Sequence, residues 1–211
     1  MATTWSRCRC WVNRRPGEPK RAKSIIVDNY PENLKPRFDA GGGVEEPFEE
    51  WWPKVQRYFP NVPEDVAKYW LHEHWSRSCY AYLRSRDYQF DLVSWPSGKL
   101  FEVRSTFNGF AADNKKCVEH GRYLVDDWEF PVPYRTSAFM IEHGEFPTPI
   151  IILDNRDGHI NSNTVQHAYE NLPAAYVLIE GHRRFNIALY LQKTGRLKPQ
   201  VYVWLMTKSP A

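Results

Sequence analysis

Gly181, His182, Arg183 and Arg184 stand together within the stretch YVLIEGHRRFNIALYLQKTG (176–195). Strand-forming residues precede them and a helical apolar pattern follows, so the group falls at a strand-to-helix corner. A helix N-terminus has free N–H groups and partial positive charge, and two arginines there oppose the dipole. A bound anion reverses that cost, because arginine forks fit phosphate oxygens and glycine lets the backbone approach. The corner predicts a phosphate site, and pairing of the arginines with surface carboxylates is an equally good interpretation of the local pattern.

Phosphate transfer also requires an acid that holds Mg²⁺ or activates the attacking group. Glu180 adjoins the glycine and is the first candidate for both roles. Glu145 is the second catalytic candidate, and Asp154, at the end of a predicted strand, is the second metal candidate. His182 can donate to a phosphate or take a proton near neutral pH, while Arg183 and Arg184 would stabilise the transferred charge.

The sequence of the first half predicts helices followed by a β-hairpin. Helices are predicted at 47–59 and 62–85, the second with Pro63 at its start and acidic residues in its first turn. Two alternating runs, 90–95 and 99–107, flank Pro-Ser-Gly and predict a β-hairpin. Residues 107–130 are polar and predict a connection with one short helix.

The second half alternates between helical and strand patterns. The predicted elements are a helix at 136–146 that stops at Gly144, a strand at 148–155, a strand at 176–180, a helix at 185–195 and a strand at 200–206. A polar insertion at 154–173 separates the first two strands, with a helix predicted at 163–171.

This pattern predicts an α+β fold in three parts. Residues 1–46 form a basic, flexible arm and linker, 47–127 a tryptophan-rich helical and hairpin region, and 128–211 a compact core. Nine tryptophans, most of them before Trp128, indicate that the first half has its own aromatic core. An aromatic contact surface is the alternative.

Charge is uneven along the chain, although the net charge is only +3. Residues 1–26 carry seven lysines and arginines against one glutamate, so this arm either contacts a DNA backbone without base specificity or is a solvated tail. Four cysteines do not make a disulfide framework in a chain of this length. No apolar run is long enough to span a bilayer and the N-terminus lacks a signal-peptide pattern, so we expect a cytoplasmic protein without membrane insertion.

Two motifs of the second half resemble the ParB/sulfiredoxin fold. The first is SAFMIEHGEFPTPIIILDN (137–155), a helix followed by glycine, proline and a hydrophobic strand. The second is the stretch 176–195 with the later VYVWLM, which resembles the phosphate motif of that fold: a hydrophobic strand, Gly-x-Arg-Arg, an alanine-bearing helix and a strand. Both motifs occur in the family's order, and the resemblance covers residues 131–206.

The resemblance implies nucleotide binding, with ATP or CTP and Mg²⁺ as cofactors. The binding residues that it implies are Gly181, His182, Arg183, Arg184, Arg135 and Thr148. Sulfiredoxins carry a cysteine where this chain has His182, which excludes sulfinic acid reduction. Only residues 207–211 follow the last predicted strand, so we do not expect the helix-turn-helix domain of chromosome-partitioning members.

The remaining relatives include plasmid fertility-inhibition proteins of the oncogenic suppression type, to which ATPase and DNase activities are ascribed. The resemblance therefore implies a nucleotide-hydrolysing, DNA-binding protein that blocks conjugative DNA transfer. The first alternative is an inactive module that inhibits a conjugation coupling protein or type IV secretion ATPase through the tryptophans of 51–75. The second is a nuclease that holds Mg²⁺ on Asp91 and Glu102, with Glu73 nearby.

Overall fold

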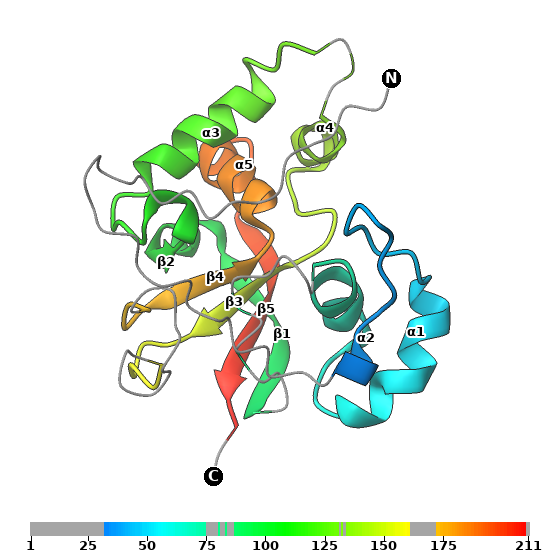
Figure 1. Cartoon of the computed structure of the whole chain (residues 1–211). Coiled ribbons are helices and arrows are strands. Elements are labelled where there is room, and N and C mark those ends of the chain that lie inside the picture. The colour runs from blue at the N-terminus through cyan, green and yellow to red at the C-terminus, as the bar shows by residue number, and fades with distance from the viewer. Residues whose placement is uncertain are drawn as a thin grey trace, which may run out of the picture.

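The computed structural model describes residues 32–74, 80, 83, 87–130, 132, 134–160 and 172–209. Helices and one mixed five-stranded sheet make up this part of the chain, which confirms the predicted α+β class (Figure 1). Residues 1–31 of the predicted arm and the helix predicted at 163–171 lie outside the described residues.

The sheet has the strand order β1-β5-β3-β4-β2. Its strands are β1 (Tyr88–Pro96), β2 (Val103–Arg104), β3 (Ile150–Asp154), β4 (Tyr176–Glu180) and β5 (Gln200–Lys208). Strand β5 pairs antiparallel with β1 and parallel with β3, while β4 pairs antiparallel with β3 and parallel with β2. The strands predicted in the second half are thus confirmed, and they form the middle of the sheet.

The predicted hairpin is wrong. Strands β1 and β2 occupy opposite edges of the sheet, and residues Ser97–Glu102 between them form a 3₁₀ helix rather than a returning strand. The backbone N–H of Ser97 donates to the carbonyl of Pro199 (2.8 Å), so the chain after β1 is tied to β5. Both edge strands precede residue 128, and the sheet therefore draws on both sides of the predicted boundary at 127/128.

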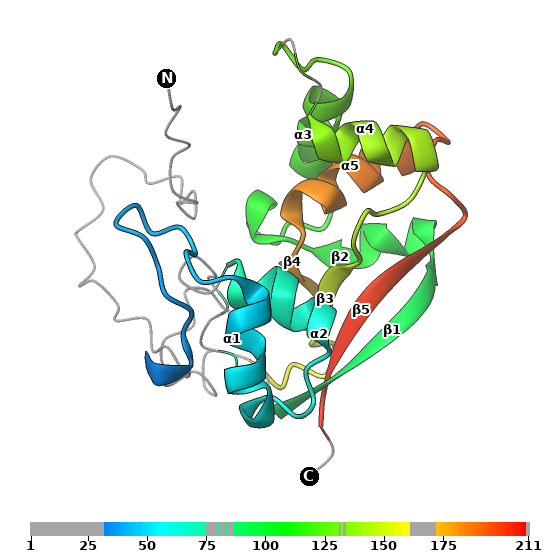
Figure 2. The same cartoon turned by 90° about the vertical axis from the view of Figure 1, so that its right-hand side faces the viewer.

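Helices cover both faces of the sheet (Figures 1 and 2). The helices are α1 (Phe48–Val55), α2 (Glu64–Val66), α3 (Lys115–Val125), α4 (Arg135–His143) and α5 (His182–Lys193), with a π-helical segment Ala67–His72 directly after α2. Along β3 the side chains alternate, so Ile151 and Leu153 join the core under α1 and α2, whereas Ile150 and Ile152 join the core under α3, α4 and α5.

Two tryptophans of the first half lie in a hydrophobic core. Trp51 and Trp70 are each 1% exposed, and Trp51 Nε1 donates to the carbonyl of Leu34 (2.9 Å). The same hydrophobic cluster contains Val177 and Ile179 of β4, so the aromatic core is shared with the sheet. A contact surface built on these two buried tryptophans is excluded.

Helices α3 and α5 pack unusually closely at Gly121. A Cβ atom at this position would lie 2.0 Å from the carbonyl oxygen of Asn186 on α5. Only a glycine lets the two backbones approach this far. The contact holds α3 against α5 and so brings residues of α3 next to the corner at 181–184. Within the described residues, no helix is both long enough and apolar enough to span a membrane.

Candidate functional site

The site lies where β4 ends and α5 begins. Gly181 sits between them with φ of 96°, a left-handed conformation that side chains rarely adopt, and a Cβ there would lie 2.5 Å from Ile150 Cγ2. No side chain caps α5 and no acidic residue occupies its first turn. Helix α5 therefore begins with backbone N–H groups that lack the usual side-chain acceptor, as an anion site requires.

The two arginines have different roles. Arg184 has a side chain only 13% exposed, and its Nη1 donates to the carbonyl of Thr148 (2.7 Å) and to the Thr148 hydroxyl. This contact ties the segment before β3 to the start of α5. Arg183 is exposed, and its Nη1 donates to the Tyr134 hydroxyl (3.2 Å) with the guanidinium 5.6 Å from the ring centroid. Arg183 is therefore the arginine that an incoming anion can reach.

Glu180 points into the corner. Its Oε1 lies 3.8 Å from Arg184 Nη2 and 3.7 Å from His74 Nε2, and the side chain is 18% exposed. His74 Nε2 is also 3.7 Å from Glu73 Oε2. A carboxylate held next to a histidine and an arginine is oriented for proton transfer or for an ion contact.

His182 is the first residue of α5 and is partly buried. Its Nε2 lies 3.2 Å from the Thr106 hydroxyl. Burial lowers the pKa of His182, with the positive charges of His74 and Arg184 acting in the same direction and Glu180 opposing them. At neutral pH the ring is therefore uncharged and can offer one N–H to a phosphate oxygen.

His120 of α3 is a second histidine close to Arg183. Burial lowers the pKa of His120, and the Arg183 charge lowers it further. Asn186 Nδ2 donates to His120 Nδ1 (3.0 Å), which leaves the His120 proton on Nε2. The ring packs against Phe107, with 4.7 Å between the centroids.

Four residues around the corner were not predicted: His74, Thr106, His120 and Tyr134. They stand 50 to 110 positions before Arg184 in the chain, so no local pattern connects them to it. The aromatic and basic residues of the first half were the signal in the sequence that this half contributes to a binding site.

Three predicted residues fall outside the immediate corner or act indirectly. Thr148 contacts Arg184 rather than solvent, so its role is to hold that arginine. Arg135 is exposed at the start of α4, next to Tyr134, and has no ion pair among the described residues. Glu145 lies in the loop after α4, where its carboxylate accepts from Lys198 Nζ (2.6 Å).

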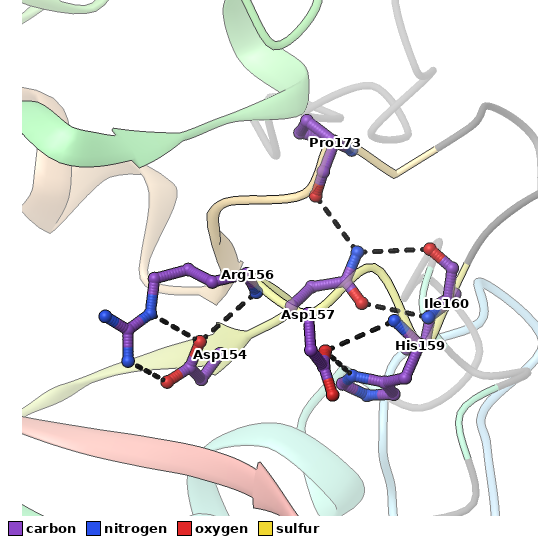
Figure 3. A network of polar contacts seen from close by, with 7 residues as sticks. Asp154, Arg156, Asp157, His159, Ile160 and Pro173 are labelled. Carbon is purple, nitrogen blue, oxygen red and sulfur yellow. Dashed lines mark hydrogen bonds and ion pairs between the residues drawn. The ribbon is translucent and has the colours of Figure 1, made fainter.

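Asp154 is at the far end of the sheet from the corner. It pairs in register with Tyr176, whereas Glu180 is four residues further along β4, roughly 13 Å away at the usual rise per residue. Figure 3 shows its carboxylate held by Arg156, with Nε to Oδ1 at 2.9 Å and Nη2 to Oδ2 at 2.7 Å. Glu180 and Asp154 therefore cannot share one metal ion, and they remain two separate metal candidates.

In the described part of the chain, no group of three or more His, Cys, Asp or Glu residues is arranged to hold a metal ion. The nuclease layout also fails, because Asp91 on β1 and Glu102 before β2 lie at opposite edges of the sheet. Mg²⁺ usually reaches such sites with phosphates and uses only one or two protein carboxylates. Of the predicted acids, Glu180 is the one that lies next to the start of α5 and can offer a carboxylate to a phosphate-bound Mg²⁺.

Comparisons of the chain with protein-family models, with curated proteins and with solved structures give no match. The ParB/sulfiredoxin resemblance thus stays a hypothesis that depends on the two sequence motifs.

Proposed function

We propose that the protein binds a nucleoside triphosphate, ATP or CTP, through its phosphates at the N-terminus of α5. The observation that carries the proposal is Arg183, an exposed arginine in the first turn of an uncapped helix that begins at a left-handed glycine. Its guanidinium donates to a tyrosine hydroxyl and forms no ion pair with a carboxylate among the described residues, so its charge is available. Helix N–H groups and arginine together are the usual phosphate receptors of proteins.

The surrounding residues have separate roles in this proposal. His182, held neutral by burial, donates an N–H to a phosphate oxygen. Arg184 holds the Thr148 loop in place and orients Glu180. Glu180 then either activates an attacking water as the general base or supplies a carboxylate oxygen to Mg²⁺. Nucleotide hydrolysis is the activity that this set of groups supports.

The sequence resemblance supplies the biological part of the proposal. As a protein similar to plasmid fertility-inhibition proteins, the chain would act in the cytoplasm, contact DNA without base specificity and cleave it, and block conjugative transfer. The seven lysines and arginines of residues 1–26 are suited to phosphate-backbone contact. Nucleotide binding is the step to test first, because the other activities depend on it.

The test is a calorimetric titration of the full chain with ATP and CTP, with and without Mg²⁺. Arg183→Ala is expected to weaken binding about tenfold to a hundredfold, the worth of a charge-assisted hydrogen bond. Arg57→Ala is the matched control, because Arg57 is also exposed and donates to a tyrosine hydroxyl, Tyr58 (2.8 Å). Equal affinity of the two variants for nucleotide would refute the proposal.

A second candidate function is inhibition of a conjugation coupling protein or secretion ATPase by contact. It is favoured by an exposed apolar surface between α3 and α4, where Phe130 is 51% and Val132 76% exposed. Trp128 packs against Phe130 and Tyr134, with centroids 4.8 Å and 5.5 Å apart. If contact alone is the function, Phe130→Ser with Val132→Ser abolishes transfer inhibition in a mating assay while Arg183→Ala does not.

A further inference from the structure

A groove of about 440 Å³ opens beside the corner, on the side of α1 and the π-helical segment. Its walls are Gly43, Val44, Phe48, Glu49, Lys68, His72, Glu73 and His74. Pockets of this size take small organic molecules. All of these residues precede the region that resembles the ParB/sulfiredoxin fold, so the resemblance assigns them nothing.

A chain of side-chain contacts links the groove to the proposed phosphate site. His74 lines the groove, and its Nε2 lies 3.7 Å from Glu180 Oε1. The same Glu180 oxygen lies 3.8 Å from Arg184 Nη2, at the first turn of α5. Glu180 thus contacts both a residue that lines the groove and a residue in the first turn of α5.

The polar groups of the groove suit a neutral ligand with hydroxyl groups rather than a phosphate. Lys68 already pairs with Glu49 (3.4 Å) and lies 5.2 Å from the centroid of the Phe48 ring. His72 Nε2 is engaged with the carbonyl of Glu46 (2.7 Å). Hydrogen bonds from its own backbone N–H and from Lys68 lower the pKa of Glu49, so its carboxylate is ionised and accepts.

The backbone is irregular where the groove meets the corner. In the π-helical segment the N–H of Glu73 donates to the carbonyl of Lys68 (3.3 Å), five residues earlier. This extra residue in the turn lets His72 face the core while His74 reaches Glu180. π-helical turns are rare and are frequently found at functional sites.

We infer that this groove holds the nucleoside half of the nucleotide, with the Glu49 and Glu73 carboxylates accepting the ribose hydroxyls. The inference depends on the proposed function, because it assumes that the phosphates bind at α5. Carboxylates repel phosphate and accept hydrogen bonds from sugar hydroxyls. The groove therefore favours the nucleoside, and the N-terminus of α5 favours the phosphates. The site should then prefer ribonucleotides over deoxyribonucleotides.

The experiment compares the binding of ATP, dATP and inorganic triphosphate to four forms of the full chain: wild type, Arg183→Ala, the Glu49→Gln and Glu73→Gln double variant, and Glu50→Gln. Glu50 is the matched control, an exposed neighbour of Glu49 on α1 that does not line the groove. All these side chains lie at the surface, and urea unfolding checks that each variant is folded.

The double variant is expected to bind ATP about tenfold more weakly, to lose its preference over dATP, and to bind inorganic triphosphate like the wild type. Arg183→Ala should weaken both ATP and triphosphate, and Glu50→Gln neither. If the double variant binds ATP as tightly as the wild type while Arg183→Ala does not, the groove assignment is wrong and the phosphate site stands. Binding that Arg183→Ala leaves unchanged, or no binding at all, overturns both.

Discussion

Replacement of Arg184 by alanine should destabilise the fold, whereas the same change at Arg183 should not. The Arg184 side chain is largely buried, and it donates to the Thr148 carbonyl (2.7 Å) and hydroxyl while facing Glu180 at 3.8 Å. Each hydrogen bond from a charged donor contributes about 1.5–3 kcal/mol, and removal of the arginine also leaves Glu180 without its cation. We expect a loss of about 2–4 kcal/mol in the free energy of unfolding.

Urea unfolding followed by tryptophan fluorescence measures the difference. With a slope of about 2–3 kcal/mol per M, the midpoint should fall by about 1–2 M for Arg184→Ala. Arg183→Ala should stay within about 0.5 kcal/mol of the wild type, as exposed positions usually do. Arg184→Lys, which keeps the charge near Glu180 but not the fork, should lie between the two.

The opposite result would refute this division of roles. If Arg184→Ala unfolds at the wild-type midpoint but loses nucleotide binding, Arg184 contacts the ligand and does not hold the Thr148 loop. If Arg183→Ala is the destabilised variant, its contact with Tyr134 is a structural one. Either outcome would contradict the assignment of Arg184 as the structural arginine and Arg183 as the arginine that faces the ligand.

Three further predictions concern stability. Gly121→Ala should cost at least about 2 kcal/mol in a thermal melt, because its Cβ would lie 2.0 Å from the carbonyl of Asn186; Gly98→Ala, whose nearest neighbour is at 3.9 Å, should be neutral. Burial lowers the pKa of His182, so below about pH 6.5 the unfolded chain binds more protons than the folded chain, and the free energy of unfolding decreases as the pH is lowered. His182→Asn should flatten this pH dependence in urea titrations. Asn155→Ala should cost about 2–3 kcal/mol by urea unfolding, because the fully buried amide bonds three backbone groups at the ends of the 160–173 segment.

The elements of the second half could be predicted because each depends on a local pattern. Gly144 ends α4 with φ of 64°, as its place after a helical run predicts. The apolar runs of β3 and β4 are buried on both faces, and such strands read as continuous apolar sequence. Helix α5 begins at the corner and ends at Lys193, with Thr194 as its C-cap and Gly195 directly after.

The hairpin failed because the choice of strand partner is not local. The alternating run of β1 and the Pro-Ser-Gly that follows fit a turn well, yet β1 pairs over nine positions with β5, from Tyr88↔Lys208 to Pro96↔Gln200. More than a hundred residues separate the partners, and no residue of β1 encodes that choice. A turn motif predicts that the chain bends and leaves open where it goes next.

Helical spacing alone does not separate the two arginines. Arg184 precedes Ala188 by four residues and Arg183 precedes Ile187 by four, and both of these apolar residues are fully buried. The difference comes from tertiary contacts, because the Thr148 loop offers acceptors to Arg184 inside the protein. Arg183 has no such buried acceptors among the described residues and faces solvent.

Residues on both sides of the predicted boundary at 127/128 contribute side chains to the corner at 181–184. Residues 128–211 supply the helix N-terminus, both arginines and Glu180, but His182 faces Thr106, and Glu180 faces His74. The Gly121 contact fixes α3, and with it His120, against α5. Since these groups are positioned by packing between the two halves, residues 128–211 alone would lack three of the side chains around Arg183 and Glu180. Any activity of this site should therefore be lost when the chain is divided at residue 127, even if each part keeps its helices.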